Sequence, residues 1–246
     1  MAGSRYEHVL RELRWRYADP EWQRYLHMHE RRYEALLAEV EAAVGGRRQP
    51  RILDAGAAYE AEAMRILLPG ATVDTLGFAD GRVAPREHER HVELDLNDAE
   101  VLERWPELGE YDVAVLAEVL EHLHVSPLHI LRLLASALTP GGTLIVQTPN
   151  AASLTNRLAL LRGRNPFEQI RESRSDPGHF REYTVDELLA LGAAAGLEPE
   201  RWFTANYFRT GTRRNRAFAA VGRAAPARLR AGITFVLRKP GAHAHA

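Results

Sequence analysis

Between residues 5 and 45, hydrophobic residues recur every three or four positions, which is the period of an amphipathic helix. Pro20 interrupts this repeat and Gly45-Gly46 follows it, so the pattern predicts two successive helices. Their apolar stripes need a surface to cover them. We therefore interpret residues 1–48 as a helical cap on the rest of the chain, either a packing layer or a lid over a ligand.

Beyond residue 50 the pattern changes, because short apolar runs alternate with helical periods. This alternation predicts an α/β fold with a parallel sheet and right-handed crossovers, a Rossmann-like sheet that carries helices on both faces. The predicted strands are 51–56, 71–77, 91–96, 111–117, 143–148, 202–208 and 233–238, and the predicted helices are 61–68, 128–138 and 185–195.

Residues 152–183 interrupt this alternation of strands and helices, and residues 241–246 follow it. Residues 152–183 are expected to leave the sheet as a helical excursion with a turn at 163–166. The helix after it has Thr184 as its N-cap, with Glu187 at the capping-box position, and Gly196 closes it. We expect one domain over residues 49–240 and a disordered tail at 241–246.

Composition narrows the functional classes. The chain has 246 residues, of which 46% are hydrophobic, enough for a substantial core. A formal charge of −1 argues against a general binder of nucleic acid or membrane surfaces. Cysteine is absent, so disulfides and thiolate chemistry are excluded. The charged N-terminus is unlike a secretory leader, and no apolar run is long enough to span a bilayer, so we expect a cytoplasmic protein.

Polar residues gather where the predicted strand 111–117 ends. Glu118, Glu121 and His122 follow it at spacings that share one face of a helical turn. Ligands of parallel α/β sheets bind at this end of the strands. Two carboxylates and an imidazole can hold a divalent ion such as Mg²⁺ or Mn²⁺, and His179 would complete the set. Alternatively, His122 or His179 acts without metal as a general base or orienting group, or the cluster is purely structural.

Several of these motifs together carry a resemblance to a known family. The strand 111–117 continues into Glu-Val-Leu-Glu-His-Leu at 118–123. Leu-Thr-Pro-Gly-Gly follows at 138–142, where we expect a turn at Pro140–Gly142, and Gln-Thr-Pro-Asn stands at 147–150. With His-Phe-Arg-Glu-Tyr-Thr at 179–184, the chain from about residue 51 to 238 resembles class I S-adenosylmethionine-dependent methyltransferases of the type 11 or type 23 kind. The resemblance implies a seven-stranded, mostly parallel sheet whose final strand is antiparallel, with S-adenosylmethionine as cofactor.

The resemblance also assigns a cofactor loop after the first strand. Asp54 and Gly56 match the family pattern of an acidic residue followed by spaced glycines. Ala58 stands at the second glycine position and Glu60 at the third, so this chain departs from the pattern there. Glycine allows the backbone to approach the cofactor closely, and the N-terminus of the next helix favours its carboxylate.

Further cofactor contacts are implied after the second and third strands. The family has an acid for the ribose after its second strand, and that place falls here on Gly77, with Asp80 three residues later. Phe78 is a candidate to stack on the adenine. After the third strand, Asp95 and Leu96 match the positions that bind the adenine edge. The alternative is that Asn97 or Asp98 merely caps the next helix, and the two roles are compatible. The family also places Glu118 against the cofactor, whereas Asp74, within a strand, is expected to be structural.

Within class I, two groups share the spacing of these acidic residues and histidines. They are the small-RNA 3′-end 2′-O-methyltransferases and the ubiquinone-pathway catechol O-methyltransferases. The resemblance implies that Glu118, Glu121, His122 and His179 hold Mg²⁺ or Mn²⁺. The metal would bind neighbouring hydroxyl groups of the acceptor and lower the pKa of one of them.

These observations predict methyl transfer to a hydroxyl of a small molecule such as a sugar, a polyol or a secondary metabolite. Arginines on the excursion suggest an acidic or phosphorylated acceptor, unless they form a solvated face; they are Arg157, Arg164, Arg171 and Arg181. We expect no membrane partner and a monomer or homodimer. Three alternatives stay open: an inert methyltransferase-like scaffold, a 2′-O-methyltransferase of RNA and, on weaker grounds, an NAD-linked dehydrogenase.

Overall fold

The structure is a computed structural model that describes all residues except 1–4, 57–58, 79–82, 174–176, 208–225 and 242–246. Within the described ranges, seven strands form one sheet in the order β3-β2-β1-β4-β5-β7-β6. The strands are β1 (Arg51–Ala55), β2 (Thr72–Gly77), β3 (His91–Glu93), β4 (Tyr111–Ala117), β5 (Leu138–Pro149), β6 (Glu198–Ala205) and β7 (Gly232–Arg238).

The first five strands pair in parallel, and β7 is antiparallel to both of its neighbours, β5 and β6. This arrangement confirms the prediction of a seven-stranded, mostly parallel sheet whose final strand is reversed. The chain order of the strands reverses between β1 and β4. In open α/β sheets a ligand crevice forms at such a switch point, outside the carboxyl ends of the strands.

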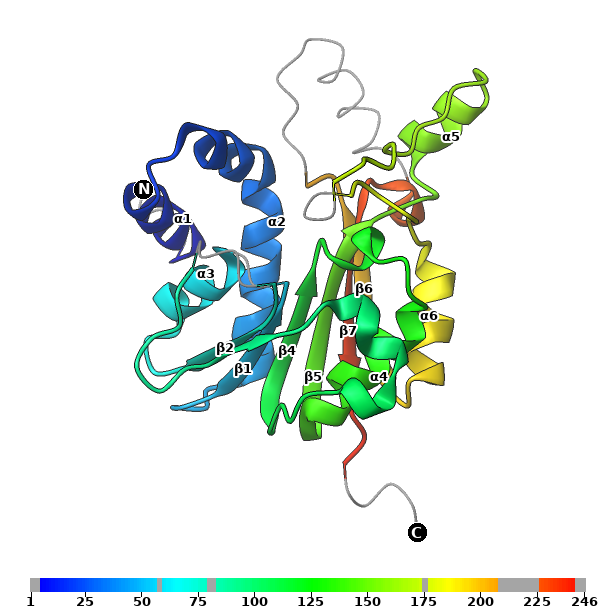
Figure 1. Cartoon of the computed structure of the whole chain (residues 1–246). Helices are drawn as coiled ribbons and strands as arrows, with labels where there is room; N and C mark the ends of the chain where they lie inside the picture. The colour runs from blue at the N-terminus through cyan, green and yellow to red at the C-terminus, as the bar shows by residue number, and fades with distance from the viewer. Residues whose placement is uncertain (1–4, 57–58, 79–82, 174–176, 208–225, 242–246) are drawn as a thin grey trace.

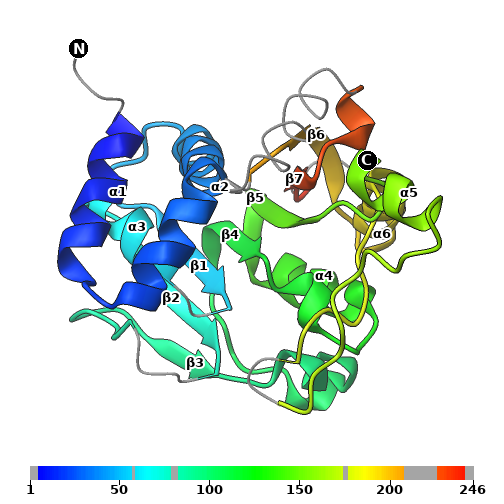
Figure 2. The same cartoon turned by 90° about the horizontal axis from the view of Figure 1, so that it is seen from above.

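Helices cover both faces of the sheet, as predicted (Figures 1 and 2). On one face lie α1 (Arg5–Arg16), α2 (Pro20–Val44) and α3 (Tyr59–Leu67), and on the other lie α4 (Pro127–Ala137) and α6 (Val185–Ala194). A further helix, α5 (Leu154–Leu160), projects from the edge where the ligand crevice is expected and has no buried side chain. Short 3₁₀ turns are η1 (Leu96–Glu100), η2 (Leu102–Arg104), η3 (Leu120–His122) and η4 (Ala227–Leu229).

Each face of the sheet has its own hydrophobic core. Along β1 and β4, Leu53 and Ala114 point to the core under α4 and α6, whereas Ile52 and Val113 point to the core under α1, α2 and α3. Strands that are buried on both faces read as continuous apolar runs, which is why the sequence pattern located them. The N-terminal helices share the second core, so they are a packing layer of the domain.

The two N-terminal helices are separated as predicted. The side chain of Asp19 accepts hydrogen bonds from the backbone of Glu21 and Trp22, and Pro20 takes the first helical position, where its missing N–H costs nothing. The helix ends at Gly45, whose φ of 59° is left-handed. None of the described helices combines the length and the hydropathy that a membrane-spanning segment requires.

Several predicted boundaries are wrong. The third strand stops at Glu93 because Asp95 caps η1. The fifth strand begins at Leu138, since the predicted turn at Pro140–Gly142 pairs with the end of β7 through hydrogen bonds between Gly141, Gly142 and Lys239. In the described part of the predicted helical excursion, only the seven residues of α5 form a regular helix and the others are loop. The predicted tail lies outside the described residues, apart from Gly241.

The cap of α6 gives a test of local stability. Thr184 and Glu187 form a complete capping box, whereas Ser126, the N-cap of α4, makes no side-chain cap hydrogen bond. We expect Thr184→Ala to destabilise the protein by about 1 kcal/mol. That lowers Tm by about 2–4 °C. The matched Ser126→Ala variant should change Tm less. Equal losses in calorimetric melting would show that the capping box has no special role.

Candidate functional site

Two glycines bring β1 and β2 together at the carboxyl edge of the sheet. Gly56 has a φ of 127° and Gly77 a φ of 143°, values that residues with a side chain rarely adopt. A Cβ on Gly56 would lie 2.6 Å from Cγ2 of Val119, and a Cβ on Gly77 would lie 3.6 Å from the Gly56 backbone. The backbone therefore explains why glycine occupies position 77, where an acid was expected.

Asp54 is a predicted cofactor residue of the first loop, and its surroundings raise the pKa of its carboxyl group. Asp54 is buried at the end of β1 and accepts a hydrogen bond from the backbone of Ala61. Burial, followed by the charge of Glu60, raises the pKa of Asp54 well above its usual value. Its Oδ2 atom is buried and has no hydrogen-bond partner among the described residues. Ala58 and Asp80, the other candidates here, lie outside the described residues.

The two bulky residues of this loop pack against α2. The ring of Tyr59 stacks on Trp22 of α2 at a centroid distance of 3.6 Å. Glu60 is buried and pairs with Arg32 of α2, with 2.5 Å between Oε1 and Nη2. Sequence reasoning missed Arg32. The available signal was an arginine on the apolar face of α2, between His29 and Leu36 at helical spacing.

The predicted adenine contacts occupy the next two loops. Phe78 is 45% exposed just after β2, so its ring is accessible. Asp95 is itself the N-cap of η1, and its Oδ1 accepts hydrogen bonds from the backbone and side chain of Asn97. Leu96 is buried in the core. Asp74 is structural as predicted, because it accepts hydrogen bonds from Tyr111 and Arg51.

Glu118 does not share a helical face with Glu121 and His122, so that prediction is wrong. Its φ is 54°, a left-handed conformation that is uncommon outside glycine, and the 3₁₀ turn η3 begins only at Leu120. Its backbone N–H donates to the carbonyl of Gln147. Burial raises the pKa of Glu118, although the charges of Arg32 and His179 oppose that rise.

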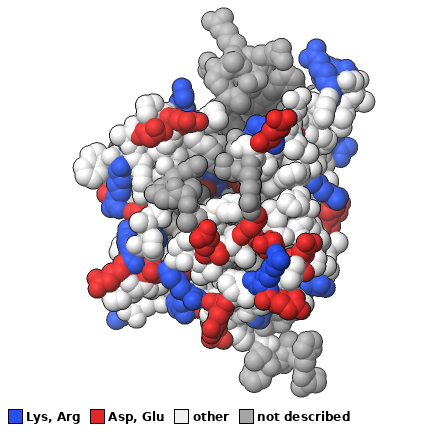
Figure 3. All heavy atoms as spheres, in the orientation of Figure 1, with Lys and Arg blue, Asp and Glu red and all other residues white. Residues whose placement is uncertain are grey.

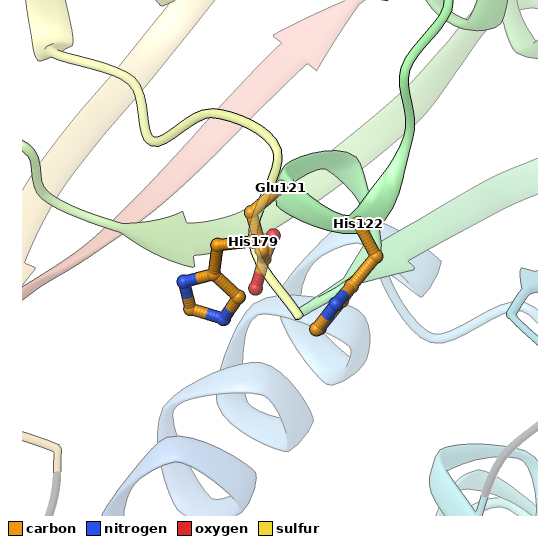
Figure 4. Close-up of side chains that lie close together, drawn as sticks. All are labelled: Glu121, His122 and His179. Atoms are coloured by element: carbon orange, nitrogen blue, oxygen red, sulfur yellow. The ribbon is translucent and has the colours of Figure 1, made fainter. Parts of the chain in front are cut away.

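Glu121, His122 and His179 do come together, with one possible ligand atom of each within 4.8 Å of the others (Figure 4). Glu121 is fully buried; Oε2 accepts a hydrogen bond from Thr148, and Oε1 has no partner among the described residues. Burial, and then the charge of Glu118, raises the pKa of Glu121 well above its usual value. The Glu121 carbonyl accepts from the backbone of Phe180, which ties the loop carrying His179 to η3.

The two histidines differ in their hydrogen bonds. Nδ1 of His122 lies 2.9 Å from the carbonyl of Gly178 and donates to it. His179 lies between two carboxylates, with 3.1 Å from Nδ1 to Glu182 and 3.1 Å from Nε2 to Glu168. Burial lowers the pKa of His179, but the hydrogen bond to Glu182 and the charge of Glu168 outweigh that effect and raise it.

This donor set fits a divalent ion only after rearrangement. A protonated imidazole has no lone pair to give, so His179 must lose a proton and turn from Glu168 before it can bind a metal. Glu118 lies outside the three-residue group, which leaves one carboxylate and two imidazoles. Imidazole ligands suit Mn²⁺ better than Mg²⁺, which prefers oxygen atoms.

The arginines of the excursion make contacts close to their own positions. Arg157 donates to the carbonyl of Ala152, Arg171 pairs with Glu168, and Arg181 pairs with Glu187. They and Arg164 are exposed. On the face shown in Figure 3, acidic and basic side chains are interspersed among the described residues without a large area of one sign. The arrangement therefore agrees with the solvated-face interpretation.

Comparison with known proteins agrees with the fold. Residues 25–201 match a family model described as a methyltransferase domain. The comparison with curated protein sequences gives no match.

Solved structures with a similar fold share little sequence with this chain. Burkholderia thailandensis 1,6-didemethyltoxoflavin-N1-methyltransferase, with bound S-adenosylhomocysteine, has a TM-score of 0.54 and 18% identity over 98% of this chain and 91% of that one. The N-methyltransferase NodS from Bradyrhizobium japonicum has 0.53 and 14% over 97% and 100%. The [4+2]-cyclase SpnF has 0.54 and 18% over 84% and 81%. At this identity the likeness shows the fold alone.

The backbone at Gly77 predicts a specific sensitivity. We expect Gly77→Ala to cost about 1–3 kcal/mol, because a φ of 143° is strained for alanine. Gly163 also has a positive φ, but its value of 67° lies in the left-handed region that other residues sometimes adopt, so Gly163→Ala should cost less. Urea unfolding measures both. Equal stability of the two variants would contradict a backbone requirement for glycine at position 77.

Proposed function

The chain belongs to the methyltransferase domain family, the class I S-adenosylmethionine-dependent enzymes, and we propose that it methylates a hydroxyl group of a small molecule. The observation that carries this proposal is the group of Glu121, His122 and His179 beside the crevice between β1 and β4. The basic nitrogen needed to remove a hydroxyl proton lies there, at the carboxyl end of β4. The dehydrogenase and inert-scaffold alternatives gain no comparable support.

The cofactor would lie across the carboxyl ends of β1, β2 and β4. Gly56 and Gly77 give this edge backbone conformations that other residues rarely adopt, and the N-terminus of α3 would favour the cofactor carboxylate. Phe78 and the Asp95–Leu96 turn would line the adenine side. Asp54 and Glu118, near the ends of the neighbouring strands β1 and β4, would favour the positively charged end of the cofactor.

Methyl transfer is an in-line displacement in which the new O–C bond forms as the S–C bond breaks. Because Nδ1 of His122 donates to Gly178, Nε2 is the basic nitrogen of this ring. It would accept the proton of the acceptor hydroxyl as the methyl group moves, leaving S-adenosylhomocysteine as product. His179, whose raised pKa favours its charged form, would stabilise the charge that develops near the acceptor oxygen from its place between Glu168 and Glu182.

A metal-assisted route uses the same residues. Glu121, His122 and His179 would hold Mn²⁺, and the ion would lower the pKa of the acceptor hydroxyl. That route requires His179 to leave Glu168, and the base route does not. The pairing of His179 with two carboxylates therefore favours the base route. An amine acceptor is a second candidate, since two proteins of similar fold are described as N-methyltransferases.

The two histidines provide the direct test of the base route. We expect His122→Ala to lower turnover at least 100-fold, because it removes the base. His179→Ala should lower turnover by a similar factor, while both variants keep the affinity for S-adenosylhomocysteine within about threefold. Transfer of labelled methyl from the cofactor to a panel of sugar, polyol, catechol and amine acceptors measures the effect. Full activity in both variants would contradict the site assignment.

Metal dependence separates the two routes. We expect the enzyme to keep its activity after treatment with a strong chelator. Calorimetric titration of Mn²⁺ into the treated enzyme should show no heat of binding that is lost in the His179→Ala variant. Loss of activity on chelation, with recovery on adding Mn²⁺ in the wild type but not in Glu121→Gln, would establish the metal-assisted route instead.

A further inference from the structure

Arg32 of α2 is fully buried and makes hydrogen bonds to four side chains from three different elements. Its Nη2 atom lies 2.5 Å from Oε1 of Glu60 and 3.2 Å from the hydroxyl of Tyr25. Its Nη1 and Nε atoms lie 3.4 Å from Oε1 of Gln147 and 3.3 Å from Nδ1 of His29. The guanidinium group thus joins α2 to the start of α3 and to β5.

The partner of this arginine is the residue that departs most from the family pattern. Glu60 stands at the third glycine position of the cofactor loop, and its side chain is 4% exposed. A carboxylate that deep needs a compensating charge, and Arg32 is the cation bonded to it. Tyr59 turns to the same side and stacks on Trp22. The substituted part of the loop therefore packs on α2.

The hydrogen bonds continue from Arg32 across the sheet. Nε2 of Gln147 donates to the backbone carbonyl of Arg32 and to Oγ1 of Thr234, and Thr234 is bonded to the hydroxyl of Tyr207. All of these side chains are buried. A buried network with several fixed partners holds its members in one orientation, so Arg32 cannot move without disturbing both sides.

From this geometry we propose that Arg32 is a positioning residue for the cofactor loop, and that the Arg32–Glu60 pair replaces the shape that glycine gives the loop in the family pattern. Helix α2 is then part of the cofactor site. The charge of Arg32 also opposes the rise in the pKa of Glu118. This inference rests on the proposed function, because it assumes that the loop holds the amino-acid end of the cofactor.

Replacing Glu60 with glycine, the residue of the family pattern, tests the proposal because the two interpretations predict opposite changes in affinity for S-adenosylhomocysteine. If position 60 were merely degenerate, Glu60→Gly would improve binding of S-adenosylhomocysteine. We expect the opposite, a dissociation constant at least tenfold higher in calorimetric titration, because the loop loses its anchor and Arg32 loses its counter-charge. An unchanged or tighter constant would overturn the proposal.

Two further variants separate positioning from folding. Arg32→Met with Glu60→Met removes both charges, so we expect a melting temperature near that of the wild type but still at least tenfold weaker binding. Glu62→Gln is the matched control, since Glu62 is two residues along α3, equally buried and paired with Arg65 and Arg16. It should lower Tm yet leave the dissociation constant within threefold. Wild-type affinity in the double variant would overturn the proposal.

A shortened ligand locates the effect. In 5′-methylthioadenosine the amino-acid end is missing, so its affinity should change less than threefold in the Glu60 variants. Equal losses for both ligands would indicate general damage to the crevice and contradict a role specific to the loop. Failure of the wild type to bind S-adenosylhomocysteine would count against the proposed function, whereas tight binding by both wild type and Glu60→Gly would count only against this inference.

Discussion

The buried guanidinium group of Arg32 is the contact on which the carboxyl edge of the sheet depends. It neutralises Glu60, bonds to Gln147 in β5 and lowers the cost of ionising Glu118. Removing one member of a buried ion pair leaves the other charge uncompensated and costs about 3–5 kcal/mol. The first loop of the sheet, the turn after β4 and helix α2 are therefore one unit, although they are distant in the sequence.

The sheet itself was predictable because its strands and helices leave a periodic pattern of hydrophobic residues in the local sequence. Strands β1, β2, β4 and β7 are largely buried on both faces, and α4 and α6 have helical periods, with a complete capping box at the start of α6. The errors arose where pairing overrides a local signal. Pro140 to Gly142 read as a turn, but this segment continues β5 because β7 supplies hydrogen bonds to it. The predicted end of the third strand failed because Asp95 caps a 3₁₀ turn.

The site was predictable in its residues but less so in its geometry. His122, Glu121 and His179 meet as expected, since they follow β4 and precede α6 on the same edge. The left-handed backbone at Glu118 separates it from that group, and nothing in the spacing of the sequence reveals it. Gly77 stands where an acid was expected, and its φ of 143° explains why this position holds glycine. Arg32 belongs to no motif and becomes visible only when α2 is placed on the sheet.

Fold alone does not choose the reaction, since proteins of this shape include a [4+2]-cyclase as well as methyltransferases. The proposed cofactor site therefore depends on whether α2 and the strand ends act together when the cofactor binds. Hydrogen exchange with and without S-adenosylhomocysteine tests this directly. Slower exchange in the loop after β1, the end of β2 and the turn after β4, together with α2 around Arg32, is the predicted result. No protection at those loops, or protection there with none in α2, would contradict it.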